Sequence, residues 1–233
     1  MAEAIQIGDP AIEIRLRRSS RARRMTLRVA QVGAGPTLTL PPGVTIAKAR
    51  AFLGDQEGWL RRHMAARPAG AVVGEGTMLP FGDRTLAIRA AAGRGMVHQG
   101  GVLGVPGPAG GHAVRVAAWL REEARRASVA AVDRHAAKLG LKPGRISLRD
   151  PRSRWGSCTA SGDLMFSWRL IMAPEAVFDY VVAHEVAHLA ELNHSPRFWA
   201  VVGRLCPDYQ AARDWLRRNG AALHTYDFGG RVD

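Results

Sequence analysis

The sequence has few cysteines and lacks long apolar runs. Only Cys158 and Cys206 occur among 233 residues, which excludes a disulfide framework and predicts a reducing compartment. No uninterrupted apolar run approaches the roughly 20 residues that a membrane-spanning helix needs. The first ten residues have neither the basic nor the apolar region of a secretory signal. We therefore expect a cytoplasmic protein that has no membrane partner.

Lysine and acidic residues are also scarce. Only Lys48, Lys138 and Lys142 are lysine, so 30 of the 33 basic residues are arginine, against 20 acidic residues and a net charge of +13. The hydrophobic content of 47% is ordinary for a folded protein and argues against wholesale disorder. The charge indicates an anionic partner such as a nucleotide or nucleic acid, although a solvated basic surface explains it equally well.

The first part of the chain has the pattern of short strands. Apolar residues alternate or cluster there, and Pro and Gly residues close the runs. Thr45 is a candidate N-cap for a helix that continues to about residue 66, because apolar residues follow it near helical spacing. The strands predicted in this way are residues 11–16, 25–30, 36–40, 86–90 and 96–105.

A stretch rich in Pro and Gly at residues 106–111 is the best candidate for a domain boundary. A long helix is predicted after it, over residues 114–139, with Gly140 at its C-terminal end. We therefore expect an N-terminal β-rich region with one helix at 1–110 and a second domain at 111–233.

The second domain mixes strands and helices. Strands are predicted at residues 146–149, 153–158 and 164–170, and helices after Pro174, at 196–205 and from 208 to about 219. The fold class expected for the chain is therefore α+β. Residues 164–168 precede the helix after Pro174, and we interpret them as an exposed strand that can pair with an extended peptide, the alternative being an interior strand.

The motif that carries chemistry is His184-Glu185-Val186-Ala187-His188, an HExxH sequence on the helix that follows Pro174. Residues i and i+4 lie on one helix face, so both imidazoles can reach one metal ion. Glu185 then points to the open side of the metal, where it can take a proton from an activated water. The alternative is two ordinary histidines with hydrogen-bond partners, which the apolar run before the motif disfavours.

A zinc site needs a third protein ligand, for which Glu191 and His194 are the candidates. Positions i, i+4 and i+7 of a straight helix span about 10 Å, which is too far for Glu191 to join both histidines. His194 can reach the metal if the helix ends at Leu192-Asn193, since Asn tolerates the left-handed conformation. We therefore prefer His194 and interpret Glu191 as a supporting or surface residue. The spacing equals that of the HExxHxxGxxH proteases, but Glu191 replaces their glycine.

Several motifs together resemble the bacterial YgjP-like metallopeptidases, a WLM-related group of zincins. The resemblance covers most of the chain and is sharpest between residues 146 and 216. The motifs are Arg154-Trp155-Gly156-Ser157-Cys158, then Pro174, then Asp179 to Leu189 around HExxH, and then Asn193-His194-Ser195-Pro196-Arg197-Phe198-Trp199. Their combination is far more specific than HExxH alone.

The resemblance implies a zincin-like catalytic domain, in which an active-site helix packs with a small antiparallel sheet. It implies one Zn²⁺ per chain with His184, His188 and His194 as ligands, and Glu185 as the catalytic base. The residues alone give the same chemistry, because three neutral imidazoles leave zinc an open position for water. The resemblance does not identify the natural substrate.

Stabilisation of the transition state needs a group beyond the metal. Tyr180 lies one helical turn before His184 and therefore on the same face. Arg154 and Arg197 are further candidates for contact with the substrate. The alternative is that Tyr180 belongs to the core and that both arginines are solvated.

An arginine-rich cluster occupies the N-terminal strand region, where seven arginines and no acidic residue occur between residues 15 and 28. Arg17, Arg21 and Arg24 are candidate contacts to phosphate or nucleic acid. The alternative is a solvated hairpin. Aromatic residues do not interleave the cluster, so a stacking platform for single strands is not supported.

Three functions remain open on the sequence alone. The first is a zinc metallohydrolase, most simply a peptidase acting on a peptide or protein substrate. The second is a metal-dependent nucleotide pyrophosphatase, because metal-activated water can also attack phosphorus. The third is a nucleic-acid-associated zincin that acts on DNA-bound proteins. The sequence predicts no oligomeric state.

Overall fold

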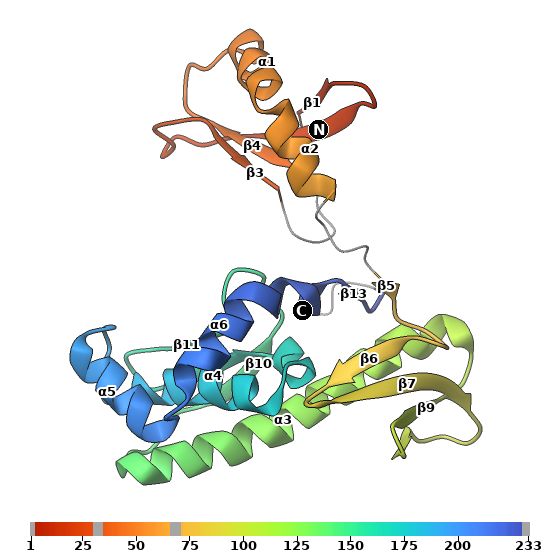
Figure 1. Cartoon of the computed structure of the whole chain (residues 1–233), viewed down its shortest axis with the longest axis vertical. Coiled ribbons are helices and arrows are strands. Elements are labelled where there is room, and N and C mark those ends of the chain that lie inside the picture. Colours follow the sequence, from red (N-terminus) through yellow and green to blue (C-terminus); the bar gives the residue numbers. More distant parts are fainter. Residues whose placement is uncertain (1–2, 30–34, 66–70, 230–233) are drawn as a thin grey trace. The chain divides into compact units, whose positions relative to one another are not determined.

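The chain forms two compact units, Met1–Gly70 and Ala71–Asp233. The computed structural model describes residues 3–29, 35–65 and 71–229. Each unit combines helices with small mixed sheets, and six α-helices occur in the described part of the chain (Figure 1). The α+β class predicted from the sequence is therefore confirmed.

The first unit is a four-stranded sheet with two helices on one face (Figure 1). Its elements are β1 (Ala4–Ile7), β2 (Ile12–Arg18), β3 (Thr26–Arg28), β4 (Thr37–Leu40), α1 (Ile46–Asp55) and α2 (Glu57–Ala65). The strand order is β1-β2-β4-β3, with β2 and β4 parallel and the other neighbours antiparallel. Alternate strand residues such as Ile14 and Leu38 are fully buried against Leu53 and Leu60 of the helices.

Local capping explains where α1 begins and ends. The hydroxyl of Thr45 accepts a hydrogen bond from the Lys48 N–H at 3.3 Å, which confirms Thr45 as the N-cap. The single helix predicted to about residue 66 is wrong, because the chain breaks at Gln56 into α1 and α2. Strand β1 was not predicted.

The second unit begins with another four-stranded sheet, ordered β6-β7-β9-β8. Its strands are β6 (Met78–Phe81), β7 (Arg84–Ala91), β8 (Val97–Gln99) and β9 (Val102–Pro106). The single strand predicted at 96–105 is a hairpin, because Gly100 and Gly101 turn the chain with positive φ values of 57° and 76°.

The sheet of the second unit shares one core with α3 (His112–Leu139). Leu86, Ile88 and Leu103 are fully buried and belong to the same apolar cluster as Leu120 of α3. The Pro/Gly stretch is a short turn whose last residues, Ala109–Gly111, lead directly into the helix. The division between compact units therefore falls at 70/71, whereas the sequence analysis placed a domain boundary at 110/111.

Helix α3 runs along the second unit and contacts β9, β10 and α4 (Figure 1). It ends where predicted, since Gly140 caps it in the left-handed conformation with φ 66°. His135, fully buried in α3, lies 2.8 Å from the Asp179 carboxylate through its Nε2 atom. The same carboxylate pairs with Arg134, so α3 and α4 (Glu175–Ala187) are joined by charge as well as by apolar packing.

A three-stranded sheet lies beside α4. It consists of β10 (Ile146–Arg149), β11 (Gly156–Cys158) and β12 (Leu164–Ser167), in the order β10-β12-β11. The predicted exposed strand at 164–168 is wrong, because β12 is the central strand and its Phe166 is fully buried. The sheet is mixed rather than antiparallel, since β10 and β12 run in parallel.

The C-terminal part of the second unit consists of helices as predicted. They are α5 (Pro196–Leu205) and α6 (Tyr209–Asn219), followed by a short 3-10 turn (Gly220–His224) and β13 (Tyr226–Asp227), which pairs with β5 (Ala71–Val72). The Ser195 hydroxyl caps α5 by accepting a hydrogen bond from the Phe198 N–H at 3.4 Å.

In the described residues no helix combines the length and apolar character needed to cross a membrane.

Candidate metal centre

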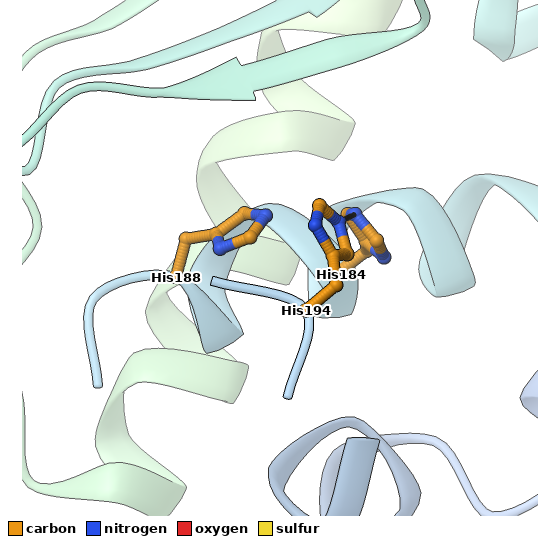
Figure 2. Close-up of side chains that lie close together, drawn as sticks. All are labelled: His184, His188 and His194. Carbon is orange, nitrogen blue, oxygen red and sulfur yellow. Dashed lines mark hydrogen bonds between the residues drawn. The ribbon is translucent and has the colours of Figure 1, made fainter. Parts of the chain in front are cut away.

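Helix α4 presents the HExxH motif at its C-terminal end. The helix is apolar on nearly all sides, and Val182, Ala183 and Val186 are fully buried in the core. This packing fixes the helix rotation, so that His184 is half-buried and faces the same side as His188 one turn later. Figure 2 shows the two imidazoles projecting from this helix end toward one another.

The chain turns immediately after the motif and brings the third histidine back. The helix ends at Ala187, with His188 as its C-cap, and a turn over residues 188–191 follows. The predicted left-handed residue at Asn193 is wrong, because no non-glycine residue in the described chain has positive φ. Instead the Asn193 side chain accepts a hydrogen bond from the Ser195 N–H at 3.1 Å, which closes the loop before α5.

The three histidines converge as the sequence predicted. One nitrogen from each of His184, His188 and His194 lies within 4.8 Å of the other two. The Nε2 atoms of His184 and His194 are 3.1 Å apart, and the His194 ring approaches from the loop (Figure 2). The Nδ1 atom of His188 lies 2.9 Å from the Glu191 carbonyl oxygen. If Nδ1–H donates this bond, the Nε2 lone pair of His188 is left free for a metal.

Burial favours the metal-binding form of two of these imidazoles, those of His184 and His188. Burial lowers the pKa of His184 to about 4, with further lowering from its proximity to His188 and His194. Burial also lowers the pKa of His188. Neutral imidazole has a lone pair to offer, whereas the protonated ring has none. The cluster is therefore ready to hold a cation at neutral pH.

Glu185 lies on the buried side of the same helix turn. Its side chain is only 6% exposed, and burial raises its pKa to about 7, against the opposing influence of the Arg154 guanidinium. A carboxyl group with a pKa near 7 can take up and release a proton at neutral pH. Glu185 is therefore the one acidic group of this helix turn that is suited to proton transfer.

Gly156 at the start of β11 makes room for this carboxyl group. A Cβ atom at Gly156 would lie 2.5 Å from Oε1, 2.6 Å from Cγ and 2.8 Å from Cδ of Glu185. Gly156 is also paired with Phe166 in the sheet, so its backbone is held in place. Any residue with a side chain would displace Glu185, which explains a glycine at this place in the Trp155-Gly156-Ser157-Cys158 segment.

An aromatic wall borders the histidines on the α6 side. Tyr180 is 6% exposed, and its ring centroid lies 5.9 Å from that of His184. Tyr209 stacks between Tyr180 and Trp199, with centroid distances of 6.3 Å and 5.3 Å. Burial raises the pKa of Tyr180 to about 12, so its phenol stays protonated and can donate a hydrogen bond.

The predicted arginines differ in their relation to the site. Arg154 is exposed and acts electrostatically on Glu185. Arg197 is exposed in the first turn of α5, and in the described part of the chain no ion pair or hydrogen bond joins it to the histidines. Arg213 of α6 was not predicted, yet its guanidinium lies 4.9 Å from the Trp199 ring. Its charge adds to the lowering of the His184 pKa that burial causes, and it partly opposes the rise that burial causes in the pKa of Tyr180. No sequence motif marks Arg213, because only the packing of α6 brings it near.

Comparison with known proteins agrees with this site. Residues 23–219 match the family described as YgjP-like, metallopeptidase domain. Among solved structures, the crystal structure of the metallopeptidase zymogen of Pyrococcus abyssi abylysin is similar with 21% sequence identity and a TM-score of 0.37. The similarity covers 42% of this chain and 95% of that chain. No curated protein matches the sequence. Because the family match spans well over half of the sequence and includes the three histidines and Glu185, the chain belongs to the YgjP-like metallopeptidases.

Proposed function

We propose that the second unit is a zincin-like zinc peptidase, with Glu185 as its general base. The observation that carries this proposal is the convergence of three imidazole nitrogens beside one buried carboxyl group with a raised pKa. A purely structural zinc site is usually closed by four protein ligands and needs no base. Within the described residues the metal-binding cluster contains three ligands, which leaves a position for substrate or water.

The donor set fits zinc. Zinc binds imidazole nitrogen at about 2.0–2.1 Å in tetrahedral sites, which places two such nitrogens about 3.3 Å apart. The 3.1 Å between Nε2 of His184 and Nε2 of His194 is close to this value. His188 has the outward Nδ1 contact to a backbone carbonyl that commonly orients a zinc-bound histidine. His184, His188 and His194 would therefore hold the ion.

Glu185 carries the proton transfers in this proposal. When bound, zinc would supply Lewis-acid activation of water and of the substrate carbonyl. Glu185 takes the proton of the attacking water and delivers it to the leaving amine. Burial of the Glu185 carboxyl group excludes bulk water and raises its pKa to about 7. The group can therefore both accept and donate a proton at neutral pH. Gly156 leaves the space that the carboxyl group occupies, because a side chain at this position would overlap it.

An extended peptide can align along β11. This strand is the edge of its sheet, since it pairs only with β12 in the described chain. It also contacts α4, the helix that carries the HExxH motif. Unpaired N–H and C=O groups of an edge strand bind peptides by adding a strand. The sequence analysis assigned peptide pairing to residues 164–168, and we now assign it to residues 156–158.

Tyr180 is the candidate for stabilising the oxyanion. Its protonated phenol lies one helical turn from His184, on the histidine side of α4. A donor aimed at the developing negative charge typically contributes a factor of about 10² to 10³ in rate. The nucleotide pyrophosphatase and the zincin that acts on DNA-bound proteins stay predictions, because no feature of the metal centre favours them over peptide hydrolysis.

The proposal is tested with purified wild-type protein and Glu185→Gln. Elemental analysis should find about one zinc per chain in both proteins, because the substitution leaves the three histidines intact. Mass spectrometry of a diverse peptide mixture should detect cleavage products with the wild type only. The control is Glu175→Gln, the same substitution at an exposed position in the first turn of α4, which should cleave like the wild type. Full turnover by Glu185→Gln would refute the assigned base, and release of phosphate from nucleotides instead of peptides would refute the substrate class.

A further inference from the structure

The sheet of the first unit has one face that its helices do not cover. Along β2, Ile14 and Leu16 point into the core, whereas Glu13, Arg15 and Arg17 are exposed. The same alternation buries Leu38 and Leu40 of β4 and leaves Thr37 and Thr39 on the other side. We call this side the open face of the sheet. In the described part of this unit, α1 and α2 both pack on the opposite, apolar face.

The strand register sorts the open face into two rows. Arg17 is paired with Thr39, which is paired in turn with Thr26 of β3. Arg15 is paired with Thr37, which is paired with Arg28. Directly opposed side chains in a sheet are about 4.5–5.5 Å apart at Cβ. One row thus carries one guanidinium group and two hydroxyls, and the other carries one hydroxyl between two guanidinium groups. The only acidic residue of β2, Glu13, lies farther along and is paired with Gln6.

A cavity of about 290 Å³ opens on this face. Three arginines line it, namely Arg17, Arg21 and Arg28, together with the hydroxyls of Thr26, Thr37 and Thr39. In the described residues none of these arginines has an ion pair, in contrast to Arg18, which pairs with Glu3 at 3.6 Å. The cavity therefore gathers positive charge that the protein itself does not neutralise.

The charge of the chain is concentrated in this unit. Residues 1–70 carry 12 basic and 5 acidic side chains, a net charge of +7. The other 163 residues carry 21 basic and 15 acidic side chains, a net charge of +6. The smaller unit therefore carries more than half of the net charge on fewer than a third of the residues, and this density of positive charge attracts anions to it.

We propose that the open face of this sheet binds the phosphodiester backbone of nucleic acid. Arginine binds phosphate oxygens with two parallel N–H donors, and threonine hydroxyls are common further donors to phosphate. The cationic surface continues beyond the cavity through Arg15, which suits a chain of phosphates better than a single small anion. The binding does not depend on the peptidase activity.

The composition of the cavity narrows the kind of contact. None of the described residues that line it is aromatic, so they offer bases no stacking surface, and binding is directed to the backbone without sequence preference. Residues 3–29 and 35–65 contribute no large apolar side chain to the lining, whereas a membrane-binding surface would insert such side chains into the lipid. The structure also refines the predicted contacts, because Arg28 joins Arg17 and Arg21 in the cavity, whereas Arg24 does not line it.

The test measures binding of the full chain to a labelled 20-base-pair DNA duplex by fluorescence anisotropy at several salt concentrations. The decisive variant is the triple substitution Arg17→Gln, Arg21→Gln and Arg28→Gln. We expect the affinity of this variant for the duplex to fall by at least about tenfold at low salt. The slope of log K against log[salt] should decrease in magnitude by about 2 to 3, because each lost phosphate contact removes about 0.9 from it. Thermal unfolding should be unchanged, because the three side chains are exposed.

The matched control removes the same charge elsewhere. Arg94→Gln, Arg217→Gln and Arg218→Gln together replace three exposed arginines of the second unit. This control should bind the duplex nearly as well as the wild type. Equal losses in the two triple variants would overturn the proposal, since net charge alone would then explain binding. The proposal would also be overturned if the wild type showed no salt-dependent binding to the duplex. It would be overturned likewise if the three arginines bound tripolyphosphate or phosphatidylserine vesicles but the protein did not bind the duplex.

Discussion

Replacing Gly156 by alanine is the sharpest test of how the base is positioned. The new Cβ would lie 2.5–2.8 Å from three atoms of the Glu185 side chain, whereas ordinary contacts begin at 3.4 Å. The two groups must therefore separate by about 0.9 Å. The backbone of Gly156 is paired with Phe166, and Glu185 is 6% exposed, so the adjustment falls on the carboxyl group. We expect Glu185 to leave its position in this variant.

The expected loss follows from that displacement. A misplacement of about 1 Å at a reacting group costs about 10²-fold in rate, equivalent to about 2.7 kcal/mol. We expect kcat/KM for peptide cleavage to fall by this factor in Gly156→Ala, with the zinc content unchanged, because the substitution does not contact the histidines. Overpacking should also lower the free energy of unfolding by about 1–3 kcal/mol, measured by urea titration.

Two comparisons separate this explanation from general damage. Gly203→Ala adds a methyl group in α5 where no atom lies within 4 Å, so activity should be retained and stability should rise by about 0.5–1 kcal/mol. In the Glu185→Gln background, Gly156→Ala should cause little further loss of activity, because both changes act on one group. Wild-type kcat/KM in Gly156→Ala, or full additivity with Glu185→Gln, would refute the reasoning.

Three further predictions concern the same site. Burial raises the pKa of Glu185 from 4.5 to about 7, so ionisation of this carboxyl group opposes folding. The free energy of unfolding of the zinc-free protein, relative to that of Glu185→Gln, should therefore be greatest below pH 4.5. It should fall by about 3 kcal/mol as the pH rises to 7. Urea titrations at several pH values measure this difference, and a difference independent of pH would contradict it. His194→Ala should retain much less than the one zinc per chain expected for the wild type, by elemental analysis after dialysis, and undiminished zinc would remove His194 from the ligand set. Tyr180→Phe should lower kcat by about 10²-fold with little change in KM, whereas unchanged kcat would assign Tyr180 to packing alone.

Local rules were sufficient for the features that depend on neighbouring residues. The caps at Thr45 and Gly140 follow from side-chain and backbone chemistry within one helical turn, and both occur as predicted. The convergence of His184 and His188 follows from the i, i+4 spacing on a helix. The position of His194 follows from a short loop, although the loop closes through the Asn193 side chain instead of a left-handed residue.

Predictions failed where contacts between distant segments decided the outcome. The Pro/Gly stretch at 106–111 looked like a linker, but the sheet before it packs on α3 after it. Residues 164–168 looked like an edge strand, but β10 and β11 pair with β12 from both sides. Nothing in the local pattern of either segment reports these partners, because strand pairing and helix packing join residues that are far apart in the chain.

The sequence by itself determined which groups can hold a metal and move a proton, because HExxH and the following histidine encode ligand spacing directly. It also determined the excess of arginine over acidic residues. Only the tertiary structure decided that Gly156 makes room for Glu185, that Arg213 acts on the pKa of His184, and that Tyr209 stacks on Tyr180. It likewise placed Arg28 with Arg17 and Arg21 in one cavity. These relations depend on strand register and helix packing, which bring together side chains whose positions in the sequence carry no common pattern.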